Sequence, residues 1–175
     1  PVPRTLLLAL LSLMPALAFA QVELYAVGPG DVLGLKVFGQ PELSGSYTVA
    51  EDGTVHIPLL GTVAAQGRSA PAISAELTRL LADGFLVQPQ VNVQVETYLS
   101  QPVQVLGAVR RPGTFYLDGP TGLLGILAEA GGVLSENSQE VRVTRAGEEG
   151  SMVVNLEVLV SGGSADLRLK SGDVV

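Results

Sequence analysis

The chain has 175 residues, of which 47% are hydrophobic, and it carries a formal net charge of −7 and no cysteine. Because the neutralisation of phosphates needs a concentrated basic surface, this composition argues against nucleic acid as a partner. The lack of cysteine excludes a disulfide framework. The length suits one domain or two small ones with a buried core.

The first twenty residues have the pattern of a secretory signal peptide. Arg4 supplies a positive charge, residues 5–13 are almost wholly apolar, and residues 18–20 (Ala-Phe-Ala) give the small-x-small pattern that a signal peptidase cleaves. We therefore expect cleavage between Ala20 and Gln21 and export of the mature chain.

An uncleaved membrane anchor is the alternative interpretation of this segment. The apolar run over residues 5–20 is shorter than the ~20 residues that a spanning helix needs, and Pro15 interrupts it. A lipid anchor would need a cysteine at the first mature position, where Gln21 stands. The sequence thus predicts a mature N-terminus without a lipid.

A glycine-rich turn precedes the first predicted strand. Gly28, Gly30 and Asp31 form the turn, and residues 33–37 then alternate between apolar and other side chains, as in a strand with one buried face. The turn lacks the Gly-Lys-Ser/Thr ending of a phosphate loop and precedes a strand, where a phosphate loop would precede a helix. We expect Asp31 to accept hydrogen bonds from nearby backbone N–H groups.

A second turn is predicted at Asp52-Gly53. This pair tolerates the positive φ angles of a tight turn, so residues 47–49 and 54–57 are expected to form a hairpin. Pro58 indicates that the second strand ends there or lies at an edge. The Glu51-Asp52 pair could also attract a cation, but it lacks the spaced oxygen ligands of a calcium loop, so a turn role is favoured.

A helix and a strand complete the first half of the chain. Ser69 is expected to cap a helix that begins near Pro71 and ends at Gly84. Its apolar stripe consists of Ile73, Leu77, Leu80 and Leu81. After Pro89, residues 91–96 alternate strictly and predict a strand. Its polar face, made of Asn92, Gln94 and Glu96, could line a wet passage or be an ordinary solvated face.

The second half repeats this order in outline. Val103, Val105 and Val109 predict a strand, Arg111-Pro112-Gly113 a turn, and residues 114–117 the returning strand. Arg110 and Arg111 could contact an acidic sugar or a neighbouring subunit, although exposed turn charges usually contribute little.

A helix, a strand pair and a closing strand follow. Thr121 is expected to cap a helix with Leu124, Leu127 and Ala128 on its apolar side, and Gly131-Gly132 to end it. Residues 141–145 and 152–154 predict a strand pair, and Gly172-Asp173 is expected to open a closing strand. A helix against a small twisted mixed sheet makes the expected fold class α+β.

Catalytic chemistry finds little support in the sequence. His56 is the single histidine, and no nucleophile or orienting acid stands at a recognisable spacing from it. A glycosidase would need two carboxylates about 5 to 10 Å apart, which some pair among 17 acidic residues meets by chance. We therefore expect no enzyme activity, no cofactor and no metal site.

Ordered motifs resemble a known family. Residues 25–33, 52–61 and 89–93 resemble the periplasmic polysaccharide export domain of Wza-type outer-membrane exporters, and residues 105–113 and 127–132 resemble the soluble-ligand-binding β-grasp (SLBB) module that follows it. The motif positions, expected to be mainly structural, are Gly28, Gly30, Asp31, Asp52, Gly53, Pro58, Gly61, Pro89, Gly107, Pro112, Gly113, Gly131, Gly132, Gly172 and Asp173.

This resemblance implies a domain organisation. Together with the predicted signal peptide at residues 1–20 and a division near residues 100–102, it gives a polysaccharide export domain at residues 21–99 and an SLBB β-grasp domain at residues 100–175, which we expect to be cut short at its last strand. Longer family members continue into further modules and an amphipathic helix that lines an outer-membrane pore. Because the chain stops at Val175, inside an expected strand, we expect either a truncated record or a short form that needs a separate outer-membrane β-barrel.

The resemblance also implies a function and partners. It predicts a periplasmic or outer-membrane component that forms a homo-oligomeric ring, passes capsular or exopolysaccharide outward and works with an inner-membrane copolymerase of the chain-length-determining type. The alternative is a periplasmic ligand- or partner-binding β-grasp module that regulates polysaccharide production without transporting it. The residues that contact polysaccharide are not identified by the sequence.

Overall fold

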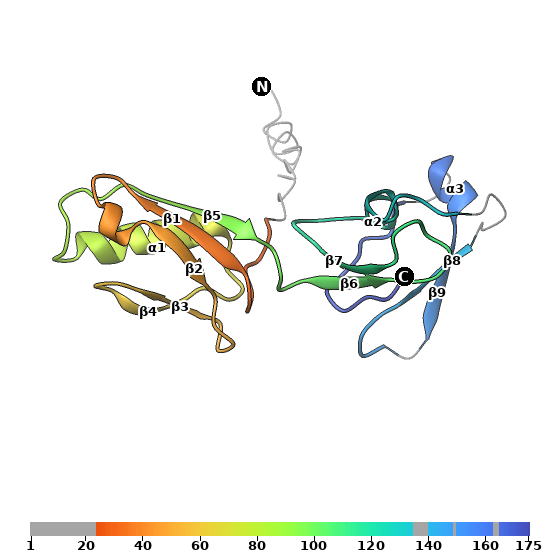
Figure 1. The fold of residues 1–175 in the computed structure, drawn as a ribbon, viewed down its shortest axis with the longest axis horizontal. Helices are drawn as coiled ribbons and strands as arrows, with labels where there is room; N and C mark the ends of the chain where they lie inside the picture. Colours follow the sequence, from red (N-terminus) through yellow and green to blue (C-terminus); the bar gives the residue numbers. More distant parts are fainter. Residues whose placement is uncertain (1–23, 135–139, 149, 163–164) are drawn as a thin grey trace, which may run out of the picture.

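The computed structural model describes residues 24–134, 140–148, 150–162 and 165–175 (Figure 1). The predicted signal peptide, with its cleavage site at Ala20 and Gln21, lies outside the described residues. The elements in chain order are β1 (Val32–Val37), η1 (Pro41–Leu43), β2 (Gly45–Thr48), β3 (Thr54–Ile57), β4 (Gly61–Ala64), α1 (Ala70–Ala82), β5 (Val91–Thr97), β6 (Pro102–Val105), β7 (Gly113–Tyr116), α2 (Leu123–Glu129), β8 (Glu140–Thr144), β9 (Ser151–Asn155) and α3 (Leu156–Val160).

The fold is α+β and contains two hydrophobic cores, one in each lobe of Figure 1. The first core draws its buried residues from positions 27–93, and the second from positions 103–169. The segment between β5 and β6 joins the two lobes. The predicted α+β class is therefore confirmed.

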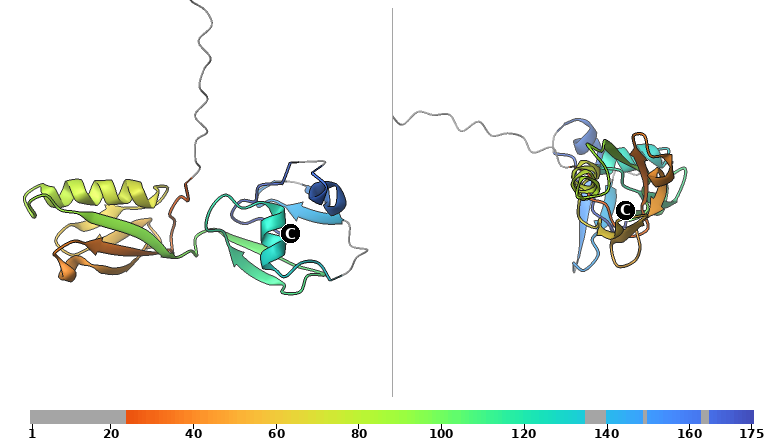
Figure 2. Two further views of the ribbon diagram at one scale, coloured as in Figure 1. Left: turned by 90° about the horizontal axis from the view of Figure 1, so that it is seen from above. Right: turned by 90° about the vertical axis from the view of Figure 1, so that its left-hand side faces the viewer.

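The N-terminal lobe has a sheet, a helix and a hairpin around its core. The sheet has the order β2-β1-β5 with antiparallel pairing, and Leu35 of β1 lies opposite Val93 of β5. Helix α1 lies along one side of this lobe, as the view from above in Figure 2 shows. The predicted strands over residues 33–37 and 91–96 are both confirmed.

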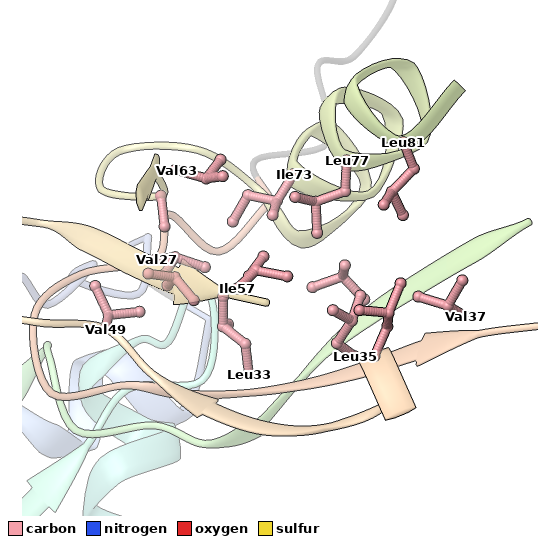
Figure 3. Close-up of a cluster of buried hydrophobic side chains, with 14 residues drawn as sticks. Val27, Leu33, Leu35, Val37, Val49, Ile57, Val63, Ile73, Leu77 and Leu81 are labelled. Atoms are coloured by element: carbon pink, nitrogen blue, oxygen red, sulfur yellow. The ribbon is translucent and has the colours of Figure 1, made fainter. Parts of the chain in front are cut away.

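Alternating side chains of β1 meet the apolar stripe of α1 in the core. Leu33 and Leu35 approach Ile73, Leu77 and Leu81 from the opposite side (Figure 3). Leu77 is 1% exposed, and burial of a leucine side chain contributes about 1.5–3 kcal/mol. The helical spacing predicted from sequence therefore places the helix against the sheet.

Helix α1 begins and ends close to its predicted limits. Ser69 occupies the N-cap position, but its hydroxyl makes no capping hydrogen bond, so the predicted side-chain cap is wrong. The helix ends at Ala82, with Asp83 as C-cap and Gly84 just beyond at φ +93°.

The predicted hairpin of residues 47–49 with residues 54–57 is wrong. Strand β2 pairs with β1, whereas β3 pairs with β4. The turn itself forms, with Gly53 at φ +77°, but the Gly53 carbonyl accepts hydrogen bonds from the N–H groups of Ala65 and Gln66 at 3.0 and 2.9 Å. These bonds extend the β3–β4 pairing, so the chain changes sheets at this turn.

The C-terminal lobe contains two strand pairs, β6 with β7 and β8 with β9, which confirms both predicted pairings. Strand β6 ends at Val105, so the predicted extension of this strand to Val109 is wrong; Val109 instead bridges Val133. The end of the chain lies between the two pairs, because Val174 bridges Gln104 in parallel and Thr144 in antiparallel orientation. Gly172-Asp173 thus opens a segment that closes the sheet, as predicted.

Helix α2 starts differently from the prediction. Gly122 is its N-cap, and the Thr121 hydroxyl donates to the Gly119 carbonyl at 3.3 Å, so the predicted Thr121 cap is wrong. The Leu123 N–H instead donates to the Leu167 carbonyl at 2.8 Å. A distant backbone segment therefore satisfies the first turn of the helix, which no local sequence signal indicates.

Candidate functional site

A groove of about 560 Å³ lies on the open face of the sheet β2-β1-β5, away from the core. This volume is within the range of about 300–1,000 Å³ that is typical of ligand sites. Because side chains alternate along a strand, the groove receives the outward residues of β1 and β5, whose inward neighbours form the core. The polar face predicted for residues 92–96 is one wall of this groove.

The strand register sets the order of side chains along the groove. Gly34 lies opposite Ser46 on one side and Gln94 on the other, and Lys36 lies opposite Asn92. Residues directly opposite in an antiparallel pair share a face of the sheet. The groove therefore presents hydroxyl, amide and ammonium groups in neighbouring rows.

Gly34 forms the floor of the groove. A Cβ atom at this position would lie 2.4 Å from the Glu96 Oε1 atom, so any larger residue would displace the Glu96 side chain from this orientation. Glu96 reaches across the glycine and accepts a hydrogen bond from the Ser46 hydroxyl at 2.6 Å. The carboxylate is thus held in one orientation over β1.

Phe38 lies at the end of the groove opposite Glu96, and 78% of its surface is exposed. The turn that carries it is fixed on both sides. The Phe38 N–H donates to the Gln90 carbonyl at 2.9 Å, and the Val37 N–H donates to the Ser44 hydroxyl at 3.0 Å. Two smaller hollows, of about 260 and 270 Å³, adjoin the same ring.

Asp31 is buried at the junction between the two lobes. Its carboxylate accepts hydrogen bonds from the N–H groups of Gly28 at 2.9 Å and of Leu99 and Ser100 at 2.8 Å each. The Tyr25 hydroxyl donates at 2.7 Å. The expected local role of Asp31 is present, and the carboxylate also fastens the segment that leads into β6.

These hydrogen bonds favour the ionised form of the Asp31 carboxyl. Burial by itself raises the pKa of Asp31, but the hydrogen bonds from Leu99, Gly28, Tyr25 and Ser100 together hold it below its ordinary value. Burial raises the pKa of the Tyr25 hydroxyl, which therefore stays protonated and donates to the carboxylate. The Tyr25 ring also packs edge-on against Tyr98, with centroids 4.7 Å apart.

Asp173 is the second buried carboxylate among the described residues. Its Oδ2 atom accepts a hydrogen bond from the Lys170 N–H at 2.8 Å. Its Oδ1 atom lies 3.7 Å from the Arg145 Nε atom, which is an ion pair without a hydrogen bond. This carboxylate is thus enclosed within the sheet-closing turn, away from the groove.

The other predicted motif positions lie at separate turns. Asp52 accepts hydrogen bonds from the Thr54 N–H and hydroxyl at 3.0 and 2.6 Å, which is the turn role expected for it. Pro58 follows directly after β3. A positive φ angle occurs at Gly30, Gly53, Gly61, Gly107, Gly131, Gly132 and Gly172. Pro89 precedes β5, and Pro112 and Gly113 lie at the start of β7.

Several residues of the groove could not be predicted from sequence motifs. Phe38, Lys36, Gly34 and Ser46 carry no motif signal, although the alternation along β1 places Gly34 and Lys36 on the face opposite the core. His56 lies exposed on β3 opposite Thr62, outside the groove.

No group of three or more acidic or histidine side chains in the described part of the chain is placed to hold a metal ion. Within that part, no helix is long and apolar enough to cross a membrane.

Comparison with known proteins identifies both parts of the chain. Residues 20–96 match the family described as polysaccharide biosynthesis/export protein, and residues 102–155 match the SLBB domain family. The EPS I polysaccharide export outer membrane protein EpsA of Ralstonia solanacearum is 30% identical, over 89% of this chain and 48% of its own length. The polysialic acid transport protein KpsD of Escherichia coli is 30% identical, over 86% of this chain and 27% of its own length.

The chain therefore spans about half the length of EpsA and about a quarter of KpsD.

Proposed function

Because the chain belongs to the Wza-type family of polysaccharide export proteins, in which an SLBB domain follows the export domain, we propose that it is a component of a capsular or exopolysaccharide export machine. In this role it forms part of an oligomeric conduit for the polymer across the outer membrane. The observation that carries the proposal is the ordered match of both domains, together with relatives named for polysaccharide export and for polysialic acid transport.

The open groove on the sheet supports a conduit role. A passage for a long hydrated chain must contact it weakly and repeatedly, because tight binding at one site would hold the polymer in place. The groove is a shallow sheet face lined by amide and hydroxyl groups with one exposed aromatic ring. Such a surface suits weak contacts better than enclosure of one small molecule.

Exposed apolar residues support assembly with other chains. Val153 on β9 is 55% exposed, and Val158 and Val160 on the adjacent α3 are 46% and 72% exposed. Apolar side chains that gather on a surface often mark protein contacts. We therefore include copies of the same chain among the partners.

The remaining partners and the location follow from the family. They are the polysaccharide, an inner-membrane copolymerase and, if the chain does not itself cross the outer membrane, a separate β-barrel. The proposed location is the periplasm or the outer membrane, with an unlipidated mature N-terminus. No enzymatic step, cofactor, metal or nucleic acid is part of the proposal.

Deletion of the gene in its native cell tests the proposal. Loss of a conduit component should leave finished polymer in the periplasm and reduce polymer at the surface, and the intact gene should restore surface polymer. Fractionation and sugar analysis of the periplasm and the cell surface provide the measurement. Unchanged surface polymer in the deletion strain would contradict the proposal.

A second pocket supports a regulatory function as the alternative. A hollow of about 390 Å³ in the C-terminal lobe is lined mainly by apolar side chains, among them Leu106, Val109 and Val141. It offers a non-transporting β-grasp module a place for a ligand or a partner protein. In that case deletion would change how much polymer is made without accumulation of polymer in the periplasm.

A further inference from the structure

We propose that the groove between Phe38 and Glu96 is a saccharide-contacting site, over which the exported polymer passes with its sugar rings against the Phe38 side chain. This inference rests on the proposed function and names the part of the molecule that contacts the polymer. It is carried by three features of the groove: unpaired polar side chains, one exposed aromatic ring and a face that is open to solvent.

The polar side chains of the groove match the chemistry of sugar hydroxyl groups. A hydroxyl both donates and accepts hydrogen bonds, and a primary amide offers both functions on one side chain. The amide groups of Asn92 and Gln94 have no hydrogen-bond partner among the described residues, and both line the groove. They are therefore available to a ligand without loss of an internal bond.

The aromatic ring suits the other face of a sugar. Pyranose rings present patches of C–H groups between their hydroxyls, and a flat apolar ring packs against such patches. Phe38 is 78% exposed and is the aromatic side chain that lines the groove. Its backbone N–H is hydrogen-bonded to the Gln90 carbonyl, which fixes the main chain from which the ring projects.

The open groove and the charges of Lys36 and Glu96 are compatible with a polymer that slides along it. The groove is open to solvent above the sheet, so a chain can enter and leave along the strands. Lys36 forms no ion pair with the described acidic side chains, whereas Glu96 is held by Ser46. Lys36 can therefore contact the carboxylate of an acidic sugar, and the amides and Phe38 serve neutral and acidic sugars alike.

Binding of two hexasaccharides to the purified chain tests the site. The probes are a hexamer of glucose, which is neutral, and a hexamer of galacturonic acid, which is acidic, titrated while amide chemical shifts are recorded by NMR. We expect weak millimolar binding, with the largest shifts at Lys36, Phe38, Asn92 and Gln94. Phe38→Ala should weaken binding of both probes roughly fivefold, the size expected for loss of one aromatic contact.

Matched variants separate the groove from the general surface. Phe85→Ala removes an aromatic side chain that is 50% exposed and lies outside the groove, so it should leave binding of both hexamers unchanged. Lys36→Gln should weaken binding of the acidic hexamer and spare the neutral one. Because Phe38 is exposed, loss of folding is not expected, and the amide spectrum reports it directly.

The binding experiment tests the site separately from the proposed export function. The proposal would be overturned if neither hexamer bound at tens of millimolar, because it relies on groups shared by all hexoses. It would also be overturned if Phe38→Ala bound the hexamers as tightly as the wild type, or if Phe38→Ala and Phe85→Ala weakened binding equally. The deletion experiment is scored in cells by polymer location. A chain whose deletion spares export but whose Phe38 variant loses binding would contradict only the export role.

Discussion

At the residue scale, two buried aspartates perform the same local task with different partners. In both turns a glycine at positive φ precedes the aspartate, whose Oδ2 atom accepts the N–H of the residue three positions earlier: Gly28 for Asp31, and Lys170 for Asp173. This local bond follows from the sequence pattern. The further donors to Asp31, at Leu99 and Ser100, come from far along the chain and could not be predicted.

Replacement of Asp31 by asparagine should destabilise the protein. An amide has one accepting oxygen, so at least one buried N–H group would lose its partner, which costs about 1–3 kcal/mol in the free energy of unfolding. Chemical denaturation measures this loss. Asp52→Asn is the matched control, because Asp52 accepts hydrogen bonds from Thr54 alone in an exposed turn. Equal destabilisation by the two variants would contradict the role assigned to Asp31.

The same carboxylate predicts a dependence of stability on pH. The folded state holds the pKa of Asp31 below its ordinary value, so the ionised form is favoured by folding. This contribution is fully present above the pKa of the unfolded state and is lost as the pH falls through the lower, folded-state pKa. Denaturation curves between about pH 6 and about pH 2 should therefore show a smaller loss of stability on acidification for Asp31→Asn than for the wild type.

At the element scale, sequence periodicity predicted the strands and α1 better than it predicted their partners. The alternation along residues 91–96 and the stripe on α1 depend on neighbours a few positions apart, and both are confirmed. The Asp52-Gly53 turn forms, and the Ala50 N–H donates to the Thr54 carbonyl at 2.8 Å, but the predicted hairpin does not continue, because β2 pairs with β1 and β3 with β4. A turn signal thus determines where the chain reverses, but long-range hydrogen bonds decide which strands pair.

The closing segment at residues 172–175 joins the two strand pairs of the C-terminal lobe. The Val174 N–H donates to the Thr144 carbonyl at 2.9 Å, and its carbonyl accepts from the Thr144 N–H at 2.8 Å. On the other side, the Gln104 N–H donates to the Asp173 carbonyl at 2.9 Å. A short segment therefore holds β6 and β8 in one sheet.

Val174→Pro should weaken the C-terminal lobe selectively. Proline removes the N–H that bonds to Thr144 and cannot occupy a central ladder position without loss of pairing. Amide hydrogen exchange should become at least about tenfold faster at Gln104 and Thr144, which corresponds to about 1.4 kcal/mol. The amides of β1 and β5 provide the internal control, since they belong to the other core. Unchanged exchange at Gln104 and Thr144 would show that the segment does not hold the sheet together.

At the scale of the whole molecule, the two lobes are joined by a short polar junction. Asp31 binds the Leu99 and Ser100 N–H groups, and the Gln101 side chain donates to the Ala26 carbonyl at 3.0 Å. Contacts between the two hydrophobic clusters contribute little to this connection, because each cluster is confined to its own lobe. The junction therefore depends on hydrogen bonds that water can compete for if the carboxylate is lost.

Self-association is the prediction that belongs to the molecule as a whole. Light scattering over a range of concentrations should show a mass that rises above that of one chain, since Val153, Val158 and Val160 expose apolar surface on neighbouring elements. Val160→Glu should reduce this association, because it places a charge on the apolar surface. A strictly monomeric mass at high concentration would count against the oligomeric conduit.

The sequence by itself determined the periodic elements, the two Gly-Asp turns and the family, since these depend on residue order and local backbone preference. The tertiary structure decided that β2 pairs with β1 and β3 with β4, that Leu99 and Ser100 bind Asp31, and that Phe38, Gly34 and Gln94 share one groove. The physical reason is that these contacts join residues from separate strands and turns. Their formation depends on register and packing, which no short stretch of sequence specifies.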